Sequence, residues 1–136
     1  MPANTSLPAV TLQNLQQLHT ALLRLHKILL DDERAAYERE HGRVAPAEML
    51  QLVIGDAQFA WLRRISELIA QVDELTESDE LDAPSRAGDV LARVRTLLLA
   101  PNPDDEFGRK YSAALQRLPD AVLAHKSVTA LIQRPN

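Results

Sequence analysis

His19, His26 and Glu33 follow one another at intervals of seven residues. On a helix this spacing puts the three side chains on one flank, with Tyr37 close to them. Imidazole and carboxylate groups bind metal ions, and helical bundles build such sites from side chains of facing helices. Residues seven apart lie about 10 Å from one another along a helix, so a metal or small-ligand site here would need acids from other helices. We keep that site as the alternative function, beside a structural role in which the histidines line a helix interface and Glu33 faces solvent.

Glu38 and His41 form a second pattern, a carboxylate and an imidazole three residues apart. Ferritin-like bundles use such pairs to hold metal ions, but they need two of them. The second pair is missing, because Val122 stands three residues before His125. We therefore interpret Glu38 and His41 as an exposed helix end, and we predict no bound metal and no cofactor.

The only tryptophan, Trp61, stands beside Arg63, Arg64 and Glu67. Tryptophan and arginine are the residues most often found as anchors of protein interfaces, and an indole next to guanidinium groups can hold a partner's side chain. We predict these four residues as a partner-binding surface. The competing interpretation is that Trp61 belongs to the core while Arg63 and Glu67 pair across one helical turn.

Composition argues against several classes of function. Without cysteine there can be no disulfide, thiolate metal site or cysteine nucleophile, and the four glycines are too isolated for a phosphate-binding loop. A net charge of −4 argues against nucleic acid as a partner. No complete catalytic set is present, so we predict a protein that is not an enzyme. General acid and base catalysis by a histidine and a glutamate that meet only in the fold stays open.

The sequence also suggests where the protein works. The first ten residues contain no base and no apolar run suited to a signal peptide, and no stretch approaches the roughly 18 apolar residues of a membrane span. We therefore expect a cytoplasmic protein that does not enter membranes. The 12 arginines stand against 3 lysines, and alanine and leucine are abundant, a bias typical of GC-rich codons that favours a bacterial source.

Apolar residues recur every three or four positions along most of the chain, which predicts helices. The longest segment carries leucines from Leu12 to Leu29, with Thr11 as a possible N-cap and Gly42 where a left-handed residue should end it. The third helix is expected to be capped by Asp56. The expected helices cover residues 11–41, 46–55, 57–75, 86–99, 104–118 and 120–133.

No strand pattern accompanies these helices, so we predict an all-α fold: an antiparallel helical bundle of about five to six helices built on one long N-terminal helix. The third helix, the fourth helix and the final pair of helices are expected to lie against that first helix. We predict a disordered segment over residues 1–10 and a single domain over residues 11–133. Segment 46–55 is apolar nearly all round and should be buried, whereas Pro119 either kinks one helix or separates two.

Three features favour a role in protein binding or self-association, as a homodimer. The first helix is longer than a domain of this size needs, no catalytic set is complete, and carboxylates crowd one strip. The acidic residues of this strip, which we interpret as a frayed helix end and a loop, are Asp73, Glu74, Glu77, Asp79, Glu80 and Asp82. We therefore expect a protein partner or a second copy of the chain.

Overall fold

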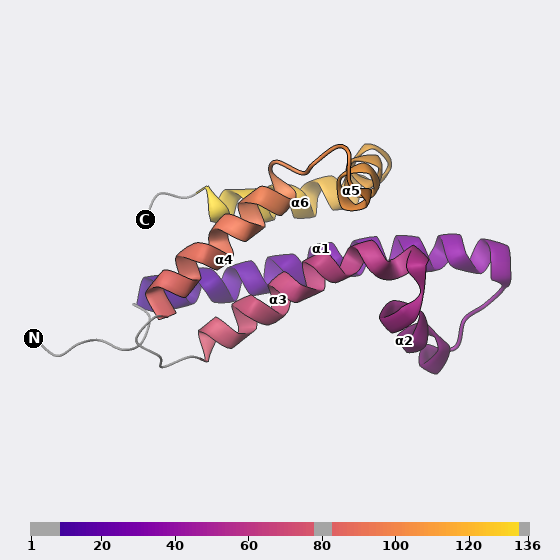
Figure 1. Cartoon of the computed structure of the whole chain (residues 1–136), viewed down its shortest axis with the longest axis horizontal. Helices are drawn as coiled ribbons and strands as arrows, with labels where there is room; N and C mark the ends of the chain where they lie inside the picture. Colours follow the sequence, from indigo (N-terminus) through magenta and orange to yellow (C-terminus); the bar gives the residue numbers. More distant parts are fainter. Residues whose placement is uncertain (1–8, 78–82, 134–136) are drawn as a thin grey trace, which may run out of the picture.

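The computed structural model of the chain describes residues 9–77 and 83–133, and every regular element within these ranges is helical (Figure 1). This confirms the predicted all-α bundle built on a long N-terminal helix. The elements are α1 (Ala9–His41), α2 (Pro46–Gly55), the 3₁₀ helix η1 (Ala57–Leu62), α3 (Arg63–Thr76), α4 (Ala83–Leu98), α5 (Glu106–Arg117) and α6 (Pro119–Ile132).

Helix α1 is the axis of the bundle, with 33 residues and one buried face. Its inward residues follow the three-and-four spacing and are all buried: Leu15, Leu18, Leu22, Leu25 and Leu29. The helix begins two residues before Thr11, which therefore lies in its first turn, while residues 1–8 of the expected disordered segment lie outside the described ranges. Gly42 follows His41 with φ of 84°, so the predicted left-handed C-terminal residue is confirmed.

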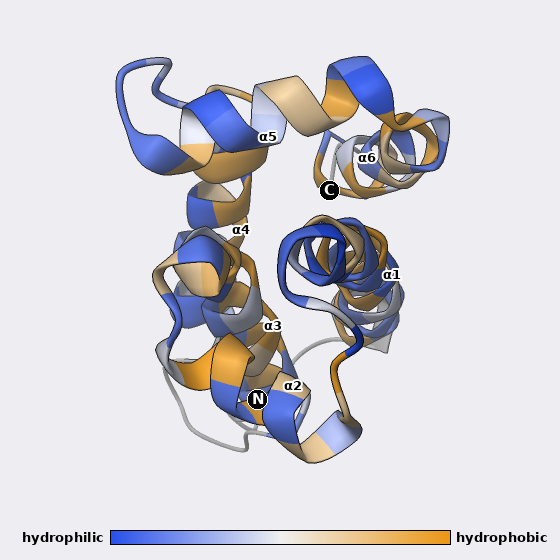
Figure 2. Cartoon of the chain, turned by 90° about the vertical axis from the view of Figure 1, so that its right-hand side faces the viewer, coloured by the Kyte–Doolittle hydropathy of each residue, from blue (hydrophilic) through white to orange (hydrophobic). Residues whose placement is uncertain are grey.

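Helices α3 and α6 pack along two sides of α1, and α4 closes the bundle by resting mainly on α3 and α6 (Figures 1 and 2). Helix α4 also comes close to α1, because Leu91 and Arg95 of α4 line a small pocket together with Leu15 of α1. The sequence predicted the apolar stripe of α4, in which Val90 and Val94 are buried, but an apolar stripe does not indicate which helices it packs against.

The third predicted helix is divided into two parts. Asp56 accepts a hydrogen bond from the backbone N–H of Gln58 at 2.8 Å, but the element that it caps is η1, and regular α-helix begins only at Arg63. The tighter 3₁₀ turns bring Phe59, Trp61 and Leu62 to the core within four positions. The acidic strip begins in α3, and its residues 78–82 lie outside the described ranges.

Pro119 separates two helices, which settles the question left open by the sequence. Leu118 has the extended conformation (φ −114°, ψ 101°), and Pro119 occupies the first turn of α6, where its missing N–H does no harm. Helix α5 consequently runs steeply across α6 (Figures 1 and 2). Its aromatic residues reach back to η1, where Phe107 lies 5.7 Å from Trp61 between ring centres.

Helix α2 lies on the opposite side of α1 and α3 from α5 and α6 (Figures 1 and 2). The expectation that this helix is buried is wrong, because it contains no buried residue. Its main neighbour is the short element η1, which covers one of its faces. Among the described helices, none is long and apolar enough to cross a membrane.

Candidate interaction surface

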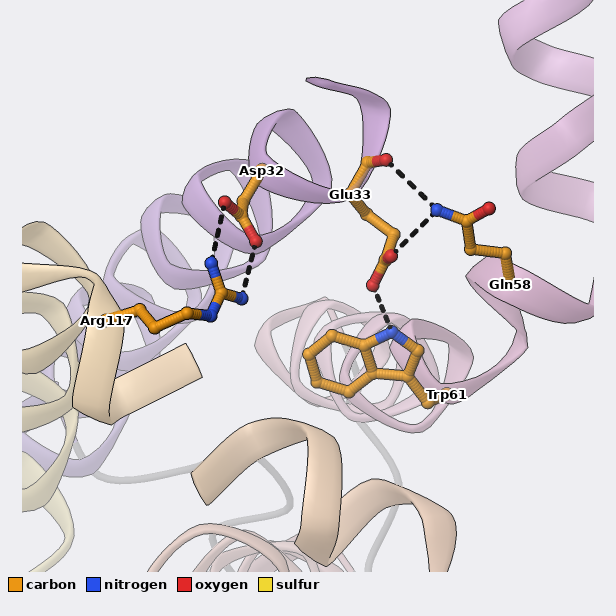
Figure 3. Close-up of polar contacts among 5 residues, drawn as sticks. All are labelled: Asp32, Glu33, Gln58, Trp61 and Arg117. Atoms are coloured by element: carbon orange, nitrogen blue, oxygen red, sulfur yellow. Dashed lines mark hydrogen bonds and ion pairs between the residues drawn. The ribbon is translucent and has the colours of Figure 1, made fainter. Parts of the chain in front are cut away.

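Trp61 lies in the core with only 4% of its surface exposed. Its ring packs beside Phe107, and its indole N–H donates a hydrogen bond to the carboxylate of Glu33 at 2.8 Å (Figure 3). A buried indole usually needs such an acceptor, and here α1 supplies it. The placement agrees with the core interpretation of Trp61, and its ring is not available to a partner on this surface.

Glu33 of α1 binds two side chains of η1. One carboxylate oxygen accepts from Trp61, and the other accepts from the side-chain amide of Gln58 at 3.0 Å, which also donates to the backbone carbonyl of Glu33 at 3.4 Å (Figure 3). The sequence placed Trp61 and Glu33 in different candidate sites and gave Gln58 no role. Since each oxygen of Glu33 already accepts a hydrogen bond, the residue acts here as a structural acceptor.

The neighbouring residue Asp32 makes a second link, to the end of α5. Arg117 donates to both carboxylate oxygens of Asp32, at 3.0 and 3.4 Å (Figure 3). This hydrogen bonding, together with the charge of Asp32, raises the pKa of Arg117. Because the arginine is exposed, the pair fixes the direction of α5 more than it adds to stability.

The residues predicted for a ligand site do not converge. His19 lies 3.8 Å from the carboxylate of Asp73, whereas Tyr37 stacks on His41 with ring centres 4.1 Å apart. Burial lowers the pKa of His26, which favours its neutral form. Within the part of the chain that the structure describes, no three histidine or acidic side chains are grouped so that they could hold a metal ion. The ligand-binding alternative stays a prediction.

The rest of the predicted partner-binding set lies at the surface. Arg63 donates to the backbone carbonyl of Ile54 at 2.7 Å and so closes the end of α2. Arg64 lies 3.4 Å from Asp105 and over the ring of Phe107, 5.7 Å from its centre. With Glu67 it lines a groove of about 340 Å³ between α3 and α4.

The structure adds a feature that the sequence analysis missed, an uncovered apolar face on α2. Met49, Leu52 and Val53 pack partly on the body of the protein, but Leu50 and Ile54 are 61% and 66% exposed. Together with the exposed Ala47 and Gln51 they form one continuous stripe, which we call the outer face of α2. Figure 2 shows the hydrophobic turns of this helix in the lower part of the view.

The segment before α2 is held in a fixed position, which in turn positions the outer face. Val44 is buried, and both of its backbone groups are bound by α1: its N–H donates to Glu38 at 2.9 Å, and its carbonyl accepts from Arg34 at 2.9 Å. Glu38, the carboxylate of the Glu38 and His41 pattern, therefore holds the segment that leads into α2. The signal for the outer face was present in the sequence, since a helix apolar on every side needs cover on every side.

Comparisons of this chain with known protein families, with characterised proteins and with solved structures find no match.

Proposed function

We propose that this protein acts without catalysis, by binding another protein molecule through the outer face of α2. The observation that carries the proposal is the exposure of Leu50 and Ile54 on a helix that has no buried residue. Single exposed apolar residues are common on protein surfaces, but Ala47, Leu50 and Ile54 adjoin on one face of α2, and adjoining exposed apolar residues are typical of an interaction site.

The energetics of α2 support the proposal. A ten-residue helix is marginal in water by itself, so its stability depends on packing. One face of α2 receives that packing from η1 and its surroundings, and the outer face does not. Burying the exposed parts of Leu50 and Ile54 would contribute roughly 1–2 kcal/mol for each side chain.

Arg63 connects this proposal with the surface expected from the sequence. Its guanidinium group lies at the C-terminal end of α2, next to the carbonyl of Ile54, and brings a positive charge to the rim of the apolar stripe. Charged rims around apolar centres are usual in protein interfaces and contribute to orientation. Arg64 and Glu67 follow along α3, and Trp61 supports this region from inside the core.

The experiment is photo-crosslinking in the native cells, with a photoreactive amino acid at position 50 and a matched control at position 123. Leu123 on α6 is 60% exposed, almost as much as Leu50, but lies outside the outer face. We expect one dominant covalent adduct from position 50 and none from position 123. Equal or absent crosslinking at the two positions would contradict the proposal.

A further inference from the structure

The outer face of α2 is symmetrical in position about the middle of the helix. Helix α2 runs from Pro46 to Gly55, so its midpoint falls between Leu50 and Gln51. Ala47 and Ile54 lie at equal distances on either side of that midpoint. A twofold axis perpendicular to the helix, passing just outside the outer face at the level of this midpoint, would therefore set the outer faces of two copies against each other in an antiparallel pair.

We propose that the occupant of the outer face is α2 of a second copy of this chain, packed antiparallel about this axis; the inference rests on the proposed function. In that pairing the small Ala47 faces the large Ile54 of the second copy, and Leu50 faces Gln51. Opposing large and small side chains fill an interface without overlap, whereas a parallel pair would put Ile54 against Ile54 and Ala47 against Ala47.

The charges at the two ends of α2 agree with this arrangement. Glu48 is exposed in the first turn of α2, and among the described residues no ion-pair partner faces it, while Arg63 lies at the other end of the helix. Antiparallel packing brings Glu48 of each copy near Arg63 of the other, which gives two complementary pairs. It also places the positive end of each helix dipole beside the negative end of the other.

The size of α2 limits the strength of this association. Ten residues make a helix about 15 Å long, so the paired helices alone bury less than the roughly 1,200–2,000 Å² of a stable dimer. We therefore expect a weak dimer that forms with rising concentration and dissociates on dilution.

Disulfide trapping tests both the occupant and its direction, because the chain contains no cysteine of its own. The variants are Ala47→Cys, Gln51→Cys, Ile54→Cys and, as the control outside the face, Leu123→Cys. Under mild oxidation we expect Gln51→Cys to form a covalent dimer by itself, because position 51 lies next to the axis. The Ala47→Cys and Ile54→Cys proteins should crosslink when mixed but not separately, since like positions are about 10 Å apart along the pair, beyond disulfide reach.

Sedimentation of the untreated protein gives an independent measurement. The wild-type protein and Leu123→Asp should show the same shift from monomer to dimer with concentration, and Leu50→Asp should weaken it at least tenfold. The inference is overturned if the wild-type protein stays monomeric and no variant crosslinks, or if Ala47→Cys crosslinks with itself as well as it does with Ile54→Cys. A photo-adduct at position 50 with a different protein would then leave the proposed function standing without the self-pairing.

Discussion

At the scale of single residues, the contact between Trp61 and Glu33 is the most informative in the molecule. It joins side chains 28 positions apart and makes a half-buried carboxylate the acceptor for a buried indole. Gln58 adds a second hydrogen bond to the same carboxylate, so one residue of α1 positions η1. The contact also explains how the polar N–H of the only tryptophan is satisfied inside the core.

The first residue-scale prediction concerns Glu33→Ala. The change leaves the indole N–H of Trp61 without its acceptor, and we expect the free energy of unfolding to fall by about 1–3 kcal/mol. Urea denaturation followed by the fluorescence of Trp61 measures it. Asp31→Ala is the control, because within the described residues Asp31 makes just an exposed pair with Lys27, and its loss should change stability by less than about 0.5 kcal/mol. Equal effects of the two variants would mean that the Trp61 hydrogen bond contributes little.

At the scale of elements, the placement of α5 depends on a close approach of backbone. Gly108 lies in the first turn of α5, and a Cβ atom there would collide with the backbone carbonyl of Asn102. The side chain of Asp105 accepts from the N–H of Gly108 at 2.7 Å and fixes this turn. Only glycine permits the loop and the helix to come so near each other.

Two glycines therefore respond in opposite ways to the same substitution. We expect Gly108→Ala to lower the free energy of unfolding by about 2 kcal/mol, because the backbone of the loop must move. Gly88→Ala, inside α4 and with open space around its Cα, should instead raise it by about 0.5–1 kcal/mol through the greater helix propensity of alanine. Thermal unfolding of both variants is the measurement, and a stabilised Gly108→Ala would contradict the close approach.

The apolar sequence of α2 predicts its burial only in part. Its sequence is apolar nearly all round, which correctly indicates that the helix needs cover on more than one side. Whether other elements of the same chain bury these sides depends on where η1, α1 and α3 end. In this structure η1 packs on one face of α2, and the outer face stays exposed.

At the scale of the whole molecule, protonation couples to folding through two histidines on neighbouring helices. Burial lowers the pKa of His26 in α1 and of His125 in α6, and it raises the pKa of Tyr111, whose hydroxyl lies 2.6 Å from Nδ1 of His125. At neutral pH the neutral imidazole and the phenol therefore share this hydrogen bond. Protonation of the imidazole makes both of its ring nitrogens donors, so Nδ1 can then no longer accept from the phenol.

The sign of the resulting pH dependence follows from these lowered values. Below the unfolded-state pKa of about 6.5, the unfolded chain takes up protons that the folded chain does not, so stability present above that pH is lost as the pH falls toward the folded-state values. We expect the free energy of unfolding to decrease between about pH 7 and 5.5. The double variant His26→Gln with His125→Gln should flatten this slope in urea titrations at the two pH values. An unchanged slope would assign it to other groups.

The local features of this protein could be predicted from its sequence. The stripe of leucines in α1 and the left-handed Gly42 depend on residues within a few positions of one another, so helix periodicity and capping rules could identify them. At Pro119 the same rules predicted a kink or a break, and the structure shows a break between two helices. The all-α bundle follows from those helices because each must bury one apolar face.

Which helix faces meet could not be predicted from the sequence and is seen in the fold. The pairing of Trp61 with Glu33, the resting of α4 on α3 and α6, and the uncovered outer face of α2 depend on helix ends and crossing directions far apart in the chain. An apolar stripe indicates that a helix face needs to be buried, but it does not indicate which helix or which other protein buries that face. That choice is made by the packing of all the helices together, because side chains interlock only when shape and direction agree across the whole core.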